Sequence, residues 1–342
     1  MKKEISILRI VATLAVLFMH CSNSMTANNI RFGVNSTQYS FFAICTVLMM
    51  WAVPVFFMMS GNLLLNSNKK FTVNQIVKKY VSRMILALFV FGVPFSIMEL
   101  VANSKTINSV YIFDSIVNVV NGDSWDHLWY LYAMIGIYIV LPAIKPFVID
   151  TDKKNLFHFI IALFLFNVVF PFINILAGTK IYFTLPLIGY SVMYFLLGAY
   201  LPSIDRYSIE KNKIFIVAAC IVLSFIQIII CLQTGDQFLK YTGYDSPLTV
   251  VWSVLIYVLF IDTIKTEHLN ENTLWKIDRL CFGVYLIHPF FINVLYKVCN
   301  IYPVKYSSYY VVVILVWICV VIASFLSAMF LSLIPFFKKY IL

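Results

Sequence analysis

Charged residues are scarce in this sequence. Only 12% of its 342 residues are Asp, Glu, Lys or Arg, about half of the share in an average soluble domain, while 62% are apolar. This composition excludes an ordinary soluble enzyme and predicts a polytopic membrane protein, all-α, with its helices around a central polar cavity. No stretch between the apolar segments is long enough for a separate soluble domain, so we expect a single integral membrane domain over 1–342.

Acidic residues are scarcer than basic ones, 15 against 25, which leaves a net charge of +10. Such an excess can indicate nucleic-acid binding. Here, however, the basic residues fall in short runs between apolar segments, which is typical of loops that determine membrane topology. We therefore expect contact with the lipid bilayer and no nucleic-acid partner.

About ten apolar spans can be counted, and an even number places both termini on one side. The termini and the even-numbered loops hold nineteen of the 25 basic residues, which predicts that this side is the cytoplasm. The spans are 5–25, 39–65, 82–102, 128–148, 156–177, 182–201, 213–233, 248–264, 280–299 and 309–337.

Closely spaced cysteines are absent as well. The seven cysteines lie mostly within spans and form no CxxC pair, so neither a disulfide framework nor a metal site is expected.

Histidine is rare, yet the first span contains one. Arg9 and His20 are eleven residues apart, a rotation of about 1100°, so both lie on one stripe of the helix together with Thr13. The rise of roughly 16 Å puts His20 near mid-membrane if Arg9 lies at an interface. An ionisable side chain at that depth is costly, which favours a functional site. The alternative is an arginine that sets topology and a core histidine with one hydrogen bond.

A second histidine lies within a span. His288 follows Tyr285 at i,i+3 on one face of span 280–299, and Pro289 predicts a kink there. Two histidines within the membrane indicate a shared polar cavity.

The second span and the loop after it carry further signals. Pro54 predicts a bend, and Ser60-Gly61 permits the close approach of another helix, as Gly198 does in the sixth span. The loop is the most basic in the chain, which suits either a topology signal or a site for phosphates at the cytoplasmic surface. Its basic residues are Lys69, Lys70, Lys78, Lys79 and Arg83.

Glu99 lies near the outer end of the third span. It either reaches into water or orients His20, since a carboxylate that holds an imidazole raises its basicity. The long outer loop 103–127 ends in acidic and aromatic residues, among them Trp125, Asp126 and Trp129 just after it. Such residues suit carbohydrate binding, and an aromatic belt at the membrane surface looks much the same.

Several stretches together resemble the acyltransferase-3 family of integral membrane acyltransferases, in the expected order and over essentially the whole chain. They are Arg9-x10-His20, Val55-Phe-Phe-Met-Met-Ser-Gly61, Ser96-x-x-Glu99, His127-Leu-Trp-Tyr-Leu131 leading to Tyr138 and Pro142, and Gly283-Val-Tyr-Leu-Ile-His288. Two positions depart from the family pattern. Tyr80 stands where an arginine is common, and Cys281 stands where a serine is common.

The resemblance implies transfer of an acyl group, usually acetyl, from cytoplasmic acetyl-CoA to a hydroxyl of a cell-envelope glycan or glycolipid on the outer face of a bacterial cytoplasmic membrane. Some members carry a further extracytoplasmic hydrolase-like domain. Because the sequence stops at Leu342, we expect this chain to complete the transfer itself or to pass the acyl group to another protein.

The site residues are assigned on this basis. His20 is the base or the transient acyl carrier, Glu99 orients it, and Tyr285 or His288 polarises the thioester or positions the acceptor. The donor contacts are expected from Arg9, Thr13, Ser60, Lys78, Lys79 and Arg83, and the glycan contacts from Trp125, Asp126 and Trp129.

Two other functions remain open from the sequence. An exporter or flippase of a polysaccharide or lipid-linked sugar would use the polar stripe as a pathway, and a scaffold for polysaccharide synthesis would need neither histidine. The acceptor, the acyl chain and the oligomeric state, a homo-oligomer included, also remain open.

Overall fold

The computed structural model describes residues 3–104, 108–179, 189–263 and 270–342. Every regular element in these ranges is a helix, and eight helical stretches are long and apolar enough to cross a membrane. The predicted all-α polytopic membrane protein is confirmed.

The helices follow one another without a strand in the described part of the chain. The α-helices are α1 (Lys3–Ala27), α2 (Asn29–Phe32), α3 (Ser36–Val47), α4 (Ala52–Leu65), α5 (Val73–Gln75), α6 (Ser82–Ser104), α7 (Val110–Asn121), α8 (Trp129–Asp150), α9 (Lys153–Phe164), α10 (Phe170–Ala177), α11 (Tyr190–Tyr200), α12 (Arg206–Lys211), α13 (Lys213–Thr234), α14 (Phe238–Thr242), α15 (Pro247–Thr263), α16 (Glu271–Asn293), α17 (Tyr309–Leu333) and α18 (Pro335–Tyr340). Short π- and 3-10 helices connect them: η1 (Ile76–Val81), η2 (Asp126–Leu128), η3 (Leu165–Val169), η4 (Leu201–Ser203), η5 (Gly235–Gln237), η6 (Val294–Val298) and η7 (Pro303–Lys305).

Eight of the ten predicted spans correspond to the long helical stretches. The other two match shorter helices. The 11-residue α11 covers the second half of span 182–201, whose first residues lie outside the described ranges, and the 17-residue α15 covers span 248–264 up to Thr263. The number of crossings and the cytoplasmic side of the termini therefore stay predictions.

The second predicted span differs from the expected single bent helix. It consists of α3 and α4, which are separated by a turn over residues 48–51. Pro54 lies in the first turn of α4, where its missing N–H is tolerated, whereas a continuous helix would bring its ring against the carbonyl of Met50. The chain therefore breaks one turn before the proline.

The outer loop 103–127 is not irregular throughout, because α7 occupies 110–121 and packs against α6. Its buried side holds Ser115 and Val119, and Asn118 donates a hydrogen bond from Nδ2 to Oγ of Ser96 at 3.0 Å. The sequence analysis missed this helix, and Ser96 of the family stretch is one of its partners.

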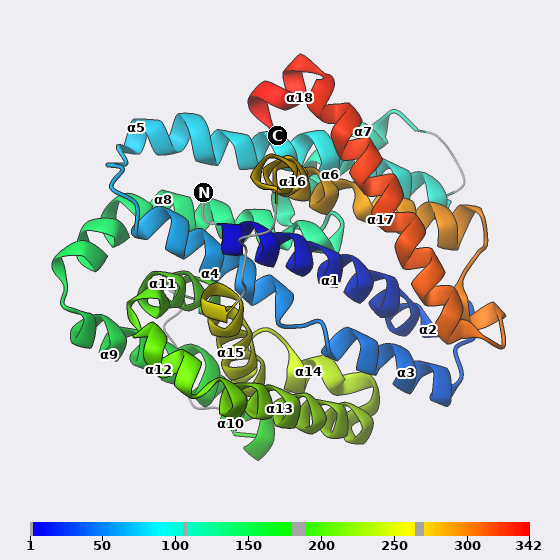
Figure 1. The fold of residues 1–342 in the computed structure, drawn as a ribbon. Helices are drawn as coiled ribbons and strands as arrows, with labels where there is room; N and C mark the ends of the chain where they lie inside the picture. The colour runs from blue at the N-terminus through cyan, green and yellow to red at the C-terminus, as the bar shows by residue number, and fades with distance from the viewer. Residues whose placement is uncertain (1–2, 105–107, 180–188, 264–269) are drawn as a thin grey trace.

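The first helix lies at the centre of the molecule (Figure 1). It contacts α3, α4, α15, α16 and α17, which surround it. The large exposed apolar side chains lie on the outer helices, above all on α13 and α17. Because a bilayer covers such surfaces, this arrangement puts α1 in the protein interior and α13 and α17 against lipid.

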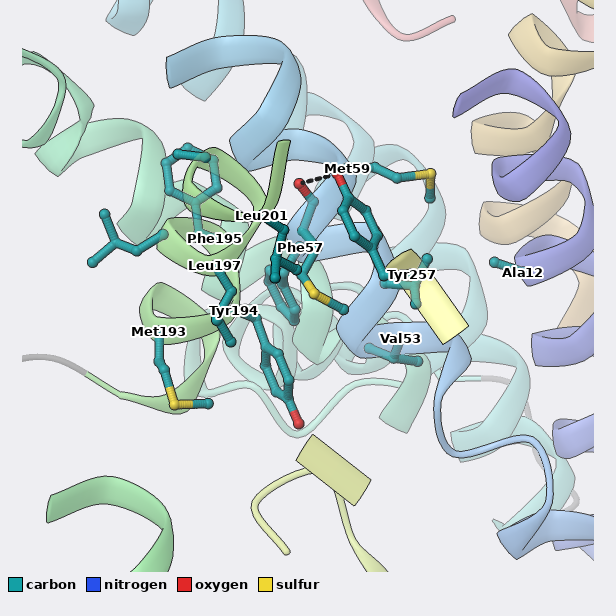
Figure 2. Packing of buried hydrophobic residues seen from close by; sticks show 14 of the residues in the cluster. Ala12, Val53, Phe57, Met59, Met193, Tyr194, Phe195, Leu197, Leu201 and Tyr257 are labelled. Atoms are coloured by element: carbon teal, nitrogen blue, oxygen red, sulfur yellow. Dashed lines mark hydrogen bonds between the residues drawn. The ribbon is translucent and has the colours of Figure 1, made fainter. Parts of the chain in front are cut away.

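The α4–α11 seam, where Gly61 of α4 and Gly198 of α11 cross, is a contact in which two helix backbones approach each other closely. A Cβ at Gly61 would lie 1.8 Å from the main-chain oxygen of Phe195, and one at Gly198 would lie 1.9 Å from that of Met58. Figure 2 shows α11 side chains packed against those of α4, with Tyr257 donating to the main-chain oxygen of Met58 at 3.5 Å. The close approach predicted for these glycines is confirmed.

Candidate functional site

Two cavities adjoin α1 and share part of their walls. The larger, the inner cavity, has a volume of about 650 Å³, and the smaller, the outer cavity, has about 300 Å³. His20, Trp129 and Tyr244 line both of them. The central polar cavity expected from the sequence is therefore present in two parts, which meet around the histidine of the first helix.

Arginines gather at one end of the inner cavity. Arg9, Arg83 and Arg279 line it there, together with the carboxylate of Asp278. Nη1 of Arg9 lies 2.8 Å from both carboxylate oxygens of Asp278, and the Asp278 side chain is only 1% exposed. This ion pair joins α1 to α16, so Arg9 has a structural partner that the sequence analysis missed.

Arg83 of α6 has partners in the C-terminal segment. It donates from Nε to the main-chain oxygen of Ile341 at 2.6 Å and from Nη2 to that of Leu342 at 2.8 Å, and its guanidinium lies 5.3 Å from the ring centre of Phe282. The end of the described chain lies beside α16 and α6 (Figure 1). Leu342 itself lines the inner cavity, so the C-terminal residues form part of its basic end.

The remaining residues assigned to the donor lie in three different places. Ser60 lines the inner cavity. Thr13 is buried, does not line it, and donates from Oγ1 to the main-chain oxygen of Arg9 at 2.8 Å. Lys78 and Lys79 lie exposed on η1, outside the cavity wall formed by the described residues.

Three histidines cluster where the cavities meet. The ring centre of His288 lies 5.1 Å from that of His20 and 5.5 Å from that of His127. The structure thus brings together the two predicted histidines and adds His127, which the sequence analysis treated only as part of a family stretch.

Hydrogen bonds fix two of these rings. Nδ1 of His288 lies 2.8 Å from the main-chain oxygen of Tyr285, and Nε2 of His127 lies 3.4 Å from that of Leu286. The hydroxyl of Tyr285 donates to the main-chain oxygen of His127. A carbonyl accepts only, so Nδ1 of His288 carries the proton and its Nε2 holds a lone pair. That Nε2 is fully buried and has no hydrogen-bond partner among the residues that the structure describes.

Glu99 is not brought to His20. It is exposed on α6, lines neither cavity, and lies close enough to Lys297 to interact with it electrostatically. The ring of His288 lies beside that of His20, and His127 is close enough to His20 to interact with it electrostatically.

The residues assigned to the glycan also divide. Asp126 and Trp129 line the outer cavity, whereas Trp125 stacks on Phe95 with ring centres 4.1 Å apart and lines neither cavity. The opposite wall comes from a part of the chain that the sequence analysis passed over. It contains Tyr190, Leu239, Gly243, Tyr244 and Asp245.

The geometry describes a membrane protein in which His20 is reached from two cavities and His127 from the inner one, while His288 packs behind them. A family model for an acyltransferase domain matches residues 2–333 of the chain. No curated protein and no solved structure matches it. Because the family match covers almost the whole sequence, the chain belongs to the acyltransferase-3 family, as its motifs indicated, and is a membrane acyltransferase.

Proposed function

We propose that this protein transfers an acyl group, acetyl in the simplest case, from cytoplasmic acyl-CoA to a hydroxyl of a glycan or glycolipid on the outer side of a bacterial cytoplasmic membrane. One observation carries the proposal. His20 lines both an inner cavity with three arginines at its end and an outer cavity with two carboxylates, Asp126 and Asp245. Two substrates, one in each cavity, can therefore meet at one imidazole.

The basic end of the inner cavity suits the phosphates of a CoA thioester. Arg83 and Arg279 line it, and phosphate oxygens are strong acceptors for guanidinium groups. A guanidinium has five N–H donors, so the two bonds of Arg83 to the C-terminal main chain leave donors for a phosphate. Arg9 contributes positive charge while Asp278 holds it in place.

The thioester then lies beside His20. In the direct route, the imidazole takes the proton of the acceptor hydroxyl, and the hydroxyl oxygen attacks the thioester carbonyl. The bond from carbonyl carbon to sulfur breaks, and the imidazolium returns the proton to the CoA thiolate. In the two-step route, the imidazole nitrogen attacks first, CoA leaves as the thiol, and the acyl-imidazole then acylates the hydroxyl.

His288 suits the orienting role that the sequence analysis gave to Glu99. Its Nε2 lone pair is buried without a partner in the described ranges, and its ring centre lies 5.1 Å from that of His20. A small rotation of His20 brings an N–H within reach of that lone pair and leaves the other His20 nitrogen as the base. Tyr285 supports the arrangement from both sides, because its hydroxyl binds His127 and its carbonyl binds His288.

The test compares purified, detergent-solubilised wild type with His20→Ala, using radiolabelled acetyl-CoA and an envelope-glycan extract. His158→Ala is the matched control, since His158 is exposed on α9 and lines neither cavity. We expect base-labile label on glycan with wild type and with the control, and none with His20→Ala. Equal labelling by all three proteins would remove His20 from the mechanism. Transport of a polysaccharide or lipid-linked sugar without acyl-CoA would favour the exporter.

A further inference from the structure

The outer cavity has two walls that come from distant parts of the chain. One wall is formed by η2 and the start of α8, with Asp126 and Trp129, and the other by the segment between α14 and α15, with Tyr244 and Asp245. Asn23, one turn beyond His20 on α1, lines it as well. The cavity thus extends from His20 away from Arg9 and the basic end.

The two carboxylates of this cavity are available to a ligand. Within the described part of the chain, the carboxylate groups of Asp126 and Asp245 make no hydrogen bond or ion pair, and no lysine or arginine lines the cavity. Ionised carboxylates only accept hydrogen bonds, so they need O–H or N–H donors from whatever enters. A ligand that carries its own negative charge meets two like charges instead.

The segment that carries Asp245 is held in place before any ligand binds. A Cβ at Gly243 would lie 2.7 Å from the main-chain oxygen of Leu239, so only glycine fits there. Oγ1 of Thr249 donates to the main-chain oxygen of Thr242 at 2.9 Å. The hydroxyl of Tyr194 donates to the main-chain oxygen of Tyr244 at 2.7 Å. A preformed wall of this kind is typical of a ligand site.

Aromatic rings form the boundary between the two cavities. The rings of Trp129 and Tyr244 are stacked with centres 5.5 Å apart and planes at 30°, and both side chains line both cavities. Ring faces pack against apolar C–H surface, and their negative π charge attracts ammonium groups and repels anions. The rings and the carboxylates therefore favour the same class of ligand.

We propose that the outer cavity is the acceptor site and that it selects sugars without negative charge. Neutral sugars and sugars with a free amine are bound through their hydroxyl or ammonium hydrogens by Asp126 and Asp245, while glycans with uronic acids or phosphates are rejected. This inference rests on the proposed function and names the acceptor class for the same site.

The experiment measures binding first and transfer second. A uronic acid has a carboxylate in place of the C6 hydroxyl, so slow acyl transfer to it could reflect the missing hydroxyl and not its charge. Three tritiated tetrasaccharides with the same β-1,4 backbone, made of glucose, glucosamine and glucuronic acid, are dialysed to equilibrium against the full-length protein in detergent. We expect the glucuronic acid tetramer to bind about tenfold more weakly than the glucose tetramer at low salt, as two partly screened like charges predict. The difference should shrink as salt is raised.

Two variants assign the effect to the cavity. The double variant Asp126→Asn/Asp245→Asn keeps the shape of both side chains and should reduce the tenfold preference to about twofold. Asp123→Asn is the matched control, since Asp123 is an exposed carboxylate nearby that does not line the cavity. It should leave the preference unchanged.

The outcomes separate this inference from the proposed function. Three results would overturn the charge-selective acceptor site. They are equal binding of the three tetramers, a preference that survives in Asp126→Asn/Asp245→Asn, and no binding at millimolar concentration. Charge-selective binding with no acetyl transfer from labelled acetyl-CoA overturns the proposed reaction and leaves the binding site standing. If acetyl is transferred to the glucuronic acid tetramer as fast as to the other two, the charge-selective acceptor site is overturned and the proposed reaction is left standing.

Discussion

Helix α4 takes part in two very different contacts at neighbouring residues. Gly61 lies in the α4–α11 seam, where no Cβ fits, while Ser60 lines the inner cavity. The seam is apolar and closed, with Tyr194 and Phe195 completely buried in it. The histidine cluster is polar, and Nε2 of His288 has no hydrogen-bond partner within the described part of the chain. The difference shows how the fold supports a hollow site: tight packing on one face of a helix keeps the adjacent, cavity-lining face in place.

The largest expected effect comes from filling the seam. Gly61→Val puts side-chain atoms into the main chain of Phe195, which cannot move aside as a flexible side chain can. Overpacking of a core typically costs about 1–3 kcal/mol, and a collision with main chain is at the upper end or beyond it. We expect little folded protein in size-exclusion chromatography.

The adjacent residue provides the control for this prediction. Ser60→Ala changes the cavity face of the same helix turn and should give a normal yield of folded protein. Normal yield and melting temperature for Gly61→Val would show that the seam does not determine the position of α4.

The second effect concerns activity alone. Replacing the base of a proton transfer typically lowers the rate by about 10²–10⁴-fold, and we expect His20→Ala to fall in this range. His20 is only partly buried, and no hydrogen bond from a described residue holds its ring. The melting temperature of the variant should therefore stay near that of wild type. A large loss of thermal stability in His20→Ala would mean that the histidine cluster contributes to packing as the seam does. It would contradict the contrast between a structural seam and a functional cluster.

The third effect lies between the other two, because the ion pair of Arg9 and Asp278 contributes both to stability and to the site. Asp278→Ala leaves Arg9 without its partner in a mostly buried position. Breaking such a pair costs about 3–5 kcal/mol when both groups are buried, and about 2 kcal/mol is expected here because the Arg9 side chain is 23% exposed. The measurement is thermal unfolding in detergent.

A double-mutant cycle with Arg9→Ala isolates the pair. The destabilisation by Asp278→Ala should largely disappear when Arg9 is already absent, because no unpaired charge is left. If the two substitutions are additive, the pair makes no net contribution and the basic end is held together by packing.

The sequence was informative where local spacing determines the structure. Gly61 and Gly198 predicted a close helix contact, because residues without a side chain let two backbones approach. The spacing of Arg9 and His20 predicted that both line one cavity, because helical periodicity puts them on one face. The Arg9–Asp278 pair was missed although a signal exists. Asp278 precedes His288 by ten residues, nearly the spacing of Arg9 and His20, so two parallel helices put both charges at one depth and both histidines at another.

The rest depends on contacts that no local pattern encodes. Glu99 has the right chemistry for a partner of His20, but the rotation of α6 leaves it exposed. Asp245 lies in a short connection whose position follows from the packing of α13, α14 and α15, so its approach to the cavity of His20 could not be read from its neighbours in sequence.

The smallest expected effect separates the residues of the basic loop. Lys78→Ala/Lys79→Ala removes two exposed charges outside the cavity wall, and screening should limit the rise in KM for acetyl-CoA to about threefold at physiological salt. Arg83→Lys, in contrast, keeps the charge but removes the fork that holds Ile341 and Leu342 beside the cavity, so a rise of tenfold or more is expected. A larger effect of the lysines than of Arg83 would place the CoA phosphates on the surface of η1, and the inner cavity would then hold only the acyl end of the donor.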